Sequence, residues 1–356
     1  MEPADSNTPF MSRRQALKLL GAGIASAALP LPGRLSAAPR TAEVDPGSIT
    51  RSFPRGGPRV PAIGLGTFMT FDLLPGQPRD HLREVFRRFW AAGGRQVDTS
   101  PLYGAAETNV GDFAESLGVG QRLFVSNKVW ATGDYLGSAD QAELGFAQSQ
   151  QRLWRSGLDV MQCHNLVNVD VVVPLLQRWK REGRIKYVGI SHHEIEYFDS
   201  LTTWIEKGQV DVVQVRYSLA TRQAETGVLR AADEHGVAVM AAMPLEKARL
   251  HQLVAGRPLP SFAAELGIET WSQYFLKWVI SHPAVTCALP ATSNPAHLVE
   301  NMGAMRGPLP DPPMRQRMLA HVQAIPGFDA LESRPWYPQK TYPGLVSAAL
   351  QELRGP

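Results

Sequence analysis

The chain has 356 residues, of which 44% are hydrophobic and 19% charged, with a formal net charge of +3. This composition is typical of a folded protein with a core, and it excludes a disordered chain, a collagen-like fibre and a disulfide-stapled miniprotein. The 28 prolines argue against a bundle of long helices, and because much of the small positive charge lies in residues 1–38, we expect no nucleic-acid-binding surface.

Residues 1–38 have the pattern of an export signal. Arg13 and Arg14 precede an apolar stretch at 19–31 and small residues at 36–38, as in secretory signals. The arginine pair resembles a twin-arginine signal, which is an address read by bacterial export machinery; the alternative is an arginine pair at the start of an ordinary amphipathic helix. The apolar stretch is too short to cross a bilayer core of about 30 Å. We therefore expect a twin-arginine signal peptide, export to the periplasm and no stable membrane anchor.

Residues 39–58 are rich in proline, glycine and serine and show no hydrophobic period, so we expect a linker there. Short apolar runs then alternate with amphipathic segments. The runs predict eight strands, at 63–67, 96–99, 123–129, 160–165, 187–192, 212–217, 237–244 and 285–290. The amphipathic segments predict helices at 80–92, 170–182, 223–235, 261–266, 269–280 and 314–325.

Strands that alternate with helices predict an α/β protein with a parallel sheet. Eight such units in this length fit a closed (β/α)₈ TIM barrel over residues 59–325. A doubly wound open sheet is the alternative. The helix at 314–325 is additional to the eight units, and residues 326–356 form a C-terminal tail rich in proline and aromatic residues.

Polar residues that can carry chemistry follow three consecutive predicted strands. Asp98 and Tyr103 follow the second strand, Lys128 lies at the end of the third and His164 at the end of the fourth. Because the reactive groups of such barrels lie at the C-terminal ends of the strands, we expect these side chains to meet at one mouth. The adjacent histidines at 192–193 would point to opposite faces of a strand, so we expect no metal site.

These motifs resemble the aldo-keto reductase family. The family pattern Asp-x-x-x-x-Tyr-Gly occurs at 98–104, its lysine strand at 126–130 and its histidine strand at 162–165. Gly-Leu-Gly-Thr at 64–67, Gly-Ile-Ser at 189–191 and Gln214 match three further strands. The resemblance covers about residues 58–305 and implies hydride transfer between NADP or NAD and a small carbonyl or alcohol substrate.

The resemblance also implies the role of each catalytic residue. Tyr103 is expected to act as the general acid, and the ammonium of Lys128 to lower the pKa of its phenol. Asp98 is expected to hold Lys128 through a charge-assisted hydrogen bond. His164 is expected to orient the substrate oxygen, and Trp130 to contact the substrate together with Tyr103 and His164.

The resemblance places the dinucleotide at the strand ends and at the start of the helix that follows the eighth strand. The expected cofactor-binding residues are Gly66, Thr67, Asp98, Ser191, His192, Gln214, Thr292, Ser293, Asn294, His297, Glu300 and Asn301. Ala291 and His297 stand where NADP-specific members often carry lysine and arginine, so the choice between NADP and NAD stays open. Near Ala242 the aromatic residue that stacks on the nicotinamide in many members is missing. We expect Met243 or an aromatic residue of the tail to replace it.

The sequence therefore predicts an exported oxidoreductase that acts on CH–OH or carbonyl groups. The alternative is a non-catalytic dinucleotide-binding or regulatory protein on the same barrel. A sugar hydrolase is disfavoured because no pair of carboxylates follows successive strands. The loops after the first, fourth and seventh strands and the tail beyond Phe328 are expected to shape the pocket. The candidate apolar walls are Phe68, Phe71, Trp130 and Trp336, with ordinary core packing as the equal alternative for each of them.

Overall fold

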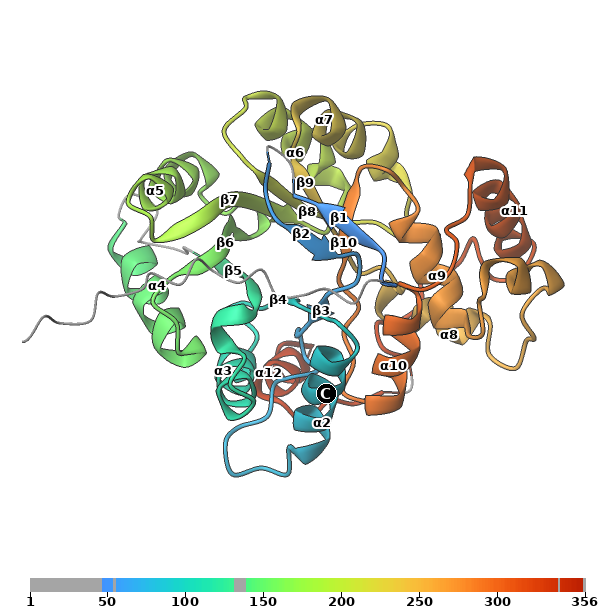
Figure 1. Cartoon of the computed structure of the whole chain (residues 1–356), viewed down its shortest axis with the longest axis horizontal. Coiled ribbons are helices and arrows are strands. Elements are labelled where there is room, and N and C mark those ends of the chain that lie inside the picture. The colour runs from blue at the N-terminus through green and yellow to red at the C-terminus, as the bar shows by residue number, and fades with distance from the viewer. Residues whose placement is uncertain (1–46, 54–55, 131–138, 339, 355–356) are drawn as a thin grey trace, which may run out of the picture. The chain divides into compact units, whose positions relative to one another are not determined.

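The computed structural model describes residues 47–53, 56–130, 139–338 and 340–354 (Figure 1). The predicted signal peptide and the first part of the predicted linker lie outside these residues. Within the described residues, no helix combines the length and the apolar character needed to cross a membrane.

Eight parallel strands follow one another around the sheet in the order of the sequence. They are β3 (Leu65–Gly66), β4 (Gln96–Asp98), β5 (Phe124–Val129), β6 (Leu158–Cys163), β7 (Ile185–His192), β8 (Val212–Arg216), β9 (Ala238–Ala242) and β10 (Val285–Ala288). The backbone N–H of Gly64 donates to the carbonyl of Ala288, and that of Gly66 to the carbonyl of Pro290, each at 2.9 Å. These bonds join the first strand to the last, so the (β/α)₈ barrel is confirmed and the open sheet is excluded.

Helices cover the outside of the sheet (Figure 1). They are α2 (Asp80–Ala91), α3 (Ala106–Ser116), α4 (Asp140–Leu153), α5 (Val169–Arg181), α6 (Phe198–Glu206), α7 (Val228–His235), α9 (Trp271–Ile280) and α10 (Pro295–Gly303), with α8 (Arg249–Leu253), α11 (Pro312–Gln323) and α12 (Leu345–Arg354) added to the repeat. The predicted helix at 223–235 is divided because Gly227, with φ −120° and ψ −82°, is not helical. The segment Ser261–Leu266 is a 3₁₀ helix.

A short antiparallel hairpin, not predicted from the sequence, lies across the barrel (Figure 1). Its strands are β1 (Thr50–Ser52) and β2 (Arg59–Pro61), so residues 50–52 of the predicted linker are in fact a strand. Phe53 is buried, and its ring packs on Phe124 at 4.8 Å and on Tyr187 at 4.9 Å. Three-residue strands are too short to produce a recognisable hydrophobic period.

The tail returns to the barrel after α11. Glu332 forms an ion pair with Arg216 at 2.8 Å, and the N–H of Tyr337 donates to the carbonyl of Lys247 at 2.9 Å. The chain then forms α12, which was not predicted, although Gly344 followed by an amphipathic stretch is typical of a helix.

A buried carboxylate joins α12 to the loop that carries Tyr103. Asp72 Oδ1 accepts from the N–H of Ala105 at 2.9 Å, and Asp72 Oδ2 accepts from the N–H of Val346 at 2.7 Å. A helix N-terminus stabilises a negative charge. Gly104 and Gly344 make room for the carboxylate, because a Cβ on either would lie within 2.5 Å of an Asp72 oxygen. The start of α12 is thereby held against this loop.

We expect Asp72→Asn to loosen α12, because an amide has one acceptor oxygen and one of the two N–H groups then loses its partner. An unpaired buried N–H costs about 1–3 kcal/mol. Hydrogen–deuterium exchange at residues 342–350 should be roughly tenfold faster or more than in the wild type, and the exchange rate of the barrel strands should not change. Asp311→Asn is the matched control, since Asp311 caps α11 through the N–H of Met314 at 2.9 Å. Equal exchange of α12 in the two variants would contradict the role of Asp72.

Candidate active site

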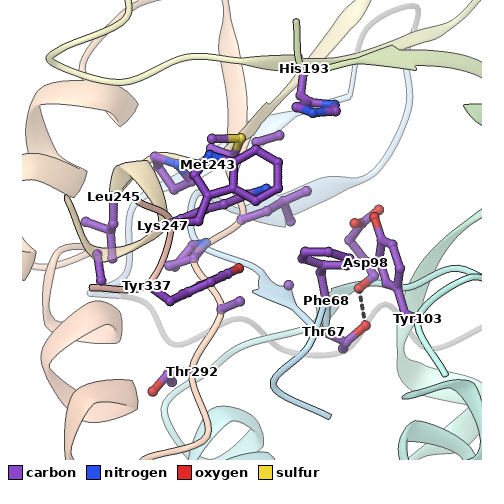
Figure 2. A pocket seen from close by; sticks show the side chains of 18 of the residues that line it. Thr67, Phe68, Asp98, Tyr103, His193, Met243, Leu245, Lys247, Thr292 and Tyr337 are labelled. Carbon is purple, nitrogen blue, oxygen red and sulfur yellow. Dashed lines mark hydrogen bonds between the residues drawn. The ribbon is translucent and has the colours of Figure 1, made fainter. Parts of the chain in front are cut away.

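The four predicted catalytic residues line one cavity of about 670 Å³ at the C-terminal ends of the strands. Asp98 ends β4, Lys128 lies in β5, His164 follows β6, and Tyr103 lies in the loop after β4. Figure 2 shows Asp98 and Tyr103 close together in this cavity. The neighbouring positions of the strands in the barrel therefore bring together residues that lie far apart in the sequence.

Lys128 and Asp98 form a buried ion pair. Lys128 Nζ lies 2.8 Å from both carboxylate oxygens of Asp98 and 2.8 Å from the carbonyl oxygen of Thr99. The two side chains are only 1% and 5% exposed. Burial lowers the pKa of Lys128, and the Asp98 carboxylate opposes that shift. The ammonium thus donates three hydrogen bonds, which a buried charge needs if it is to be tolerated.

A layer of side-chain amides lies beside this pair. Gln214 Nε2 donates to Asp98 Oδ2 at 3.2 Å, and Gln162 Nε2 donates to Gln214 Oε1 at 2.8 Å and to Ser126 Oγ at 2.6 Å. The hydroxyl of Thr67 donates to the carbonyl of Asp98 at 2.9 Å (Figure 2). These contacts come from four different strands or strand ends, so the register of the sheet determines where the carboxylate lies.

Tyr103 lies against the ammonium of the pair, and its ring centroid is 4.9 Å from Lys128 Nζ. Phe68 packs edge-on against the same ring at 5.0 Å. Burial raises the pKa of Tyr103 well above its usual range, and the charges of Asp98 and Tyr337 add to this shift. The predicted net lowering of this pKa is therefore wrong, because burial outweighs the stabilisation of a phenolate by the nearby ammonium of Lys128. With its pKa raised, the phenol of Tyr103, which is partly buried in the wall of the cavity, keeps its proton at neutral pH.

His164 is a neutral imidazole in the wall of the cavity. Burial lowers its pKa to about 2, and the charges of Lys128, His193 and His192 add to the effect. Its Nδ1 lies 3.4 Å from the hydroxyl of Ser100. A neutral imidazole carries one N–H, which can donate to a substrate oxygen without adding a charge.

Trp130 and Phe68, two of the predicted apolar walls, line the cavity. The ring of Trp130 lies edge-on to that of His164 at 5.4 Å. For Phe71 the alternative of core packing is confirmed, because this residue is fully buried and its ring centroid lies 6.2 Å from that of Phe113. A hydrophobic residue in a loop carries no sequence signal that separates a core position from a cavity wall.

Most of the predicted cofactor-binding residues line the same cavity. They are Gly66, Thr67, Asp98, Ser191, His192, Gln214, Thr292, His297, Glu300 and Asn301. Ser293 and Asn294 do not line it; the side chain of Asn294 instead caps α10 by accepting from the N–H of Ala296 at 2.8 Å. His192 stacks on Tyr197 with the ring centroids 3.8 Å apart.

Several residues that line the cavity were not predicted. They come from the loop after β7, the loop after β9 and the tail, and include His193, Lys247, His251, Tyr337, Lys340 and Tyr342. Figure 2 shows Lys247 and Tyr337 on the side of the cavity away from Asp98 and Tyr103. Trp336 and Tyr337 of the tail line the cavity together with Ala242 and Met243. Both candidates for replacing the aromatic residue that is missing near Ala242, Met243 and an aromatic residue of the tail, are therefore present in the cavity. The loop after β9, which follows the seventh predicted strand, and the tail were expected to shape the pocket and do line it, but no motif in the sequence picked out Lys247, Tyr337 or the other unpredicted residues.

Comparison with known proteins identifies relatives of this chain. A model of the Aldo/keto reductase family matches residues 62–316. The chain is 27% identical over 256 residues to the methylglyoxal reductase YeaE of Escherichia coli, covering 69% of this chain and 86% of YeaE. It is 24% identical over 261 residues to the uncharacterized oxidoreductase YtbE of Bacillus subtilis, with 69% and 83% covered. A crystal structure of an aldo/keto reductase from Klebsiella pneumoniae with NADP and acetate is 27% identical, with a TM-score of 0.63, and covers 77% of this chain and 95% of its own.

Proposed function

Since this chain belongs to the aldo/keto reductase family, we propose that it interconverts a small carbonyl compound and its alcohol with NADP(H) or NAD(H). The observation that carries the proposal is the buried Lys128–Asp98 pair against the ring of a protonated Tyr103, in a cavity large enough for ligands. The names of YeaE and YtbE, a reductase and an oxidoreductase, support the same reaction class.

The residues of the cavity fit a dinucleotide. Asn301 Oδ1 is buried without a hydrogen-bond partner in the described part of the chain, so an acceptor is free for a ligand amino group. Thr292 and the N-terminus of α10 offer donors for a phosphate group. When bound, the reduced nicotinamide supplies the hydride. The NADP in the Klebsiella structure favours NADP for this chain as well.

The protein's part in the reaction is to hold the carbonyl and protonate its oxygen. Tyr103 is the general acid: its raised pKa keeps the phenol protonated at neutral pH, and the phenol gives up this proton when the carbonyl oxygen becomes strongly basic during the reaction. His164, held neutral, donates a hydrogen bond to that oxygen without competing as an acid. Once Tyr103 has lost its proton, the adjacent Lys128 ammonium stabilises the phenolate, and Asp98 keeps the ammonium in position.

We expect Tyr103→Phe to lower kcat by about 10²- to 10⁴-fold, which is the usual contribution of a general acid, with the Kd of NADPH unchanged. Turnover is measured by NADPH absorbance over a panel of aldehydes and ketones. Because the pKa of Tyr103 is raised, the rate at which the wild-type protein reduces a carbonyl compound should not decrease as the pH is increased to about 10, the usual pKa of tyrosine. Undiminished turnover in Tyr103→Phe would contradict this assignment. Wild-type protein that binds NADPH but turns over no carbonyl would favour the non-catalytic alternative.

We also propose that the chain is exported by the twin-arginine pathway with its dinucleotide already bound. The arginine pair at 13–14, the apolar stretch and the small residues at 36–38 support this proposal. Replacing both arginines with lysine should leave the protein in the cytoplasm of a bacterial host, as measured by fractionation and immunoblotting. Periplasmic levels equal to those of the wild type would contradict it.

A further inference from the structure

Lys247 directs an ammonium group into the cavity from the loop after β9 (Figure 2). Its Nζ lies 2.9 Å from the ring centroid of Trp336 and 5.2 Å from that of Phe68. Phe68 in turn packs against Tyr103 at 5.0 Å. The ammonium therefore lies between two aromatic rings, one of which contacts the proposed general acid.

The backbone around Lys247 is strained. Glu246, Lys247 and Ala248 have φ angles of 50°, 48° and 68°, and Met243 has a φ of 51°. Non-glycine residues avoid this left-handed region, and consecutive residues rarely adopt it. Such strain persists where surrounding contacts enforce it and is frequent at ligand-binding sites.

The contacts that enforce the strain converge on the buried carboxylate of Glu246. It accepts hydrogen bonds from Arg216 Nε at 3.1 Å and Nη2 at 2.5 Å, Arg249 Nη2 at 2.5 Å, Ser218 Oγ at 2.7 Å and Thr221 Oγ1 at 2.9 Å. Arg216 also pairs with Glu332 of the tail at 2.8 Å. With Glu246 held in this network, the next side chain, Lys247, lies in the cavity.

The ammonium of Lys247 lacks an anionic partner. Among the described residues, no acceptor lies within hydrogen-bond distance of Nζ, and Glu246 is occupied by the two arginines. Burial lowers the pKa of Lys247 to about 6, and the charges of Arg249 and Arg216 add to the effect while Glu246 opposes it. A partly buried cation without an anion is unfavourable, and the ring of Trp336 compensates for it only in part, so at neutral pH the amine is mostly uncharged and takes up its proton when an anion binds beside it.

We propose that Lys247 is an anion-binding residue of the cavity and pairs with a phosphate or carboxylate group of a ligand that lies near Phe68 and Trp336. Two ligands of the proposed function carry such a group, the dinucleotide through its phosphates and the substrate through a carboxylate. In this form the inference rests on that function.

The first experiment measures the binding of inorganic pyrophosphate and of NADPH to the full chain by calorimetry. If the anion is a phosphate of the dinucleotide, Lys247→Met should raise the Kd of both about tenfold, as the loss of one charge-assisted hydrogen bond does, and Lys247→Arg should restore most of the affinity. Lys207→Met is the matched control, because Lys207 Nζ lies 3.9 Å from the ring of Trp204, outside the cavity. It should change neither Kd.

The second experiment identifies the source of the anion by comparing the KM of benzaldehyde with that of 4-carboxybenzaldehyde. If the anion belongs to the substrate, Lys247→Met leaves the Kd of NADPH unchanged and raises the KM of the carboxylated aldehyde alone, by about tenfold. Pyrophosphate binding that depends on Lys247, in a protein that does not bind NADPH, would support the anion site while contradicting the proposed function. Unchanged Kd values for pyrophosphate and NADPH, together with an unchanged ratio of KM values, would overturn the inference.

Discussion

The ion pair of Lys128 and Asp98 is the interaction on which the rest of the site depends. A charge inside a barrel is tolerated only when its hydrogen-bonding groups are satisfied; here the ammonium donates to two carboxylate oxygens and a carbonyl, and the carboxylate also accepts from Gln214. Because Asp98 and Lys128 lie on the paired strands β4 and β5 and Gln214 lies on β8, this set of hydrogen bonds is complete only when the strands have paired in the correct register. The register of the strands therefore determines both the fold and the position of the Lys128–Asp98 pair.

The C-terminal tail supplies part of the wall of the cavity. Tyr337 adds to the shift that keeps Tyr103 protonated, and Trp336 contacts the ammonium of Lys247. The tail is attached at two places, through Glu332 on Arg216 and through the start of α12 on Asp72. Residues more than 200 positions away in the sequence therefore contribute to the environment of the Tyr103 phenol, and the charge of Tyr337 adds to the upward shift of its pKa.

The sequence predicted the eight strands and the meeting of Asp98, Tyr103, Lys128 and His164 at one cavity, because apolar runs and the residues that follow them are local signals. It did not predict the hairpin of β1 and β2, whose strands have three residues each, or the raised pKa of Tyr103. The direction of this shift follows from burial and from the charges of Asp98 and Tyr337, which only the folded chain brings close to Tyr103. Lys247 was missed for the same reason, since its orientation depends on a carboxylate network formed by β8, the loop after β9 and the tail.

The most direct test of the central claim is the rate of hydride transfer in a single turnover, measured with NADPH bound to the double variant Asp98→Asn, Lys128→Met. Removing both charges avoids leaving one of them buried alone, so the fold and NADPH binding should be retained. If the pair holds the ammonium for the phenolate of Tyr103, transfer to an aldehyde should slow by about 10²-fold or more. Transfer as fast as in the wild type would show that the site works without the pair and would contradict the account.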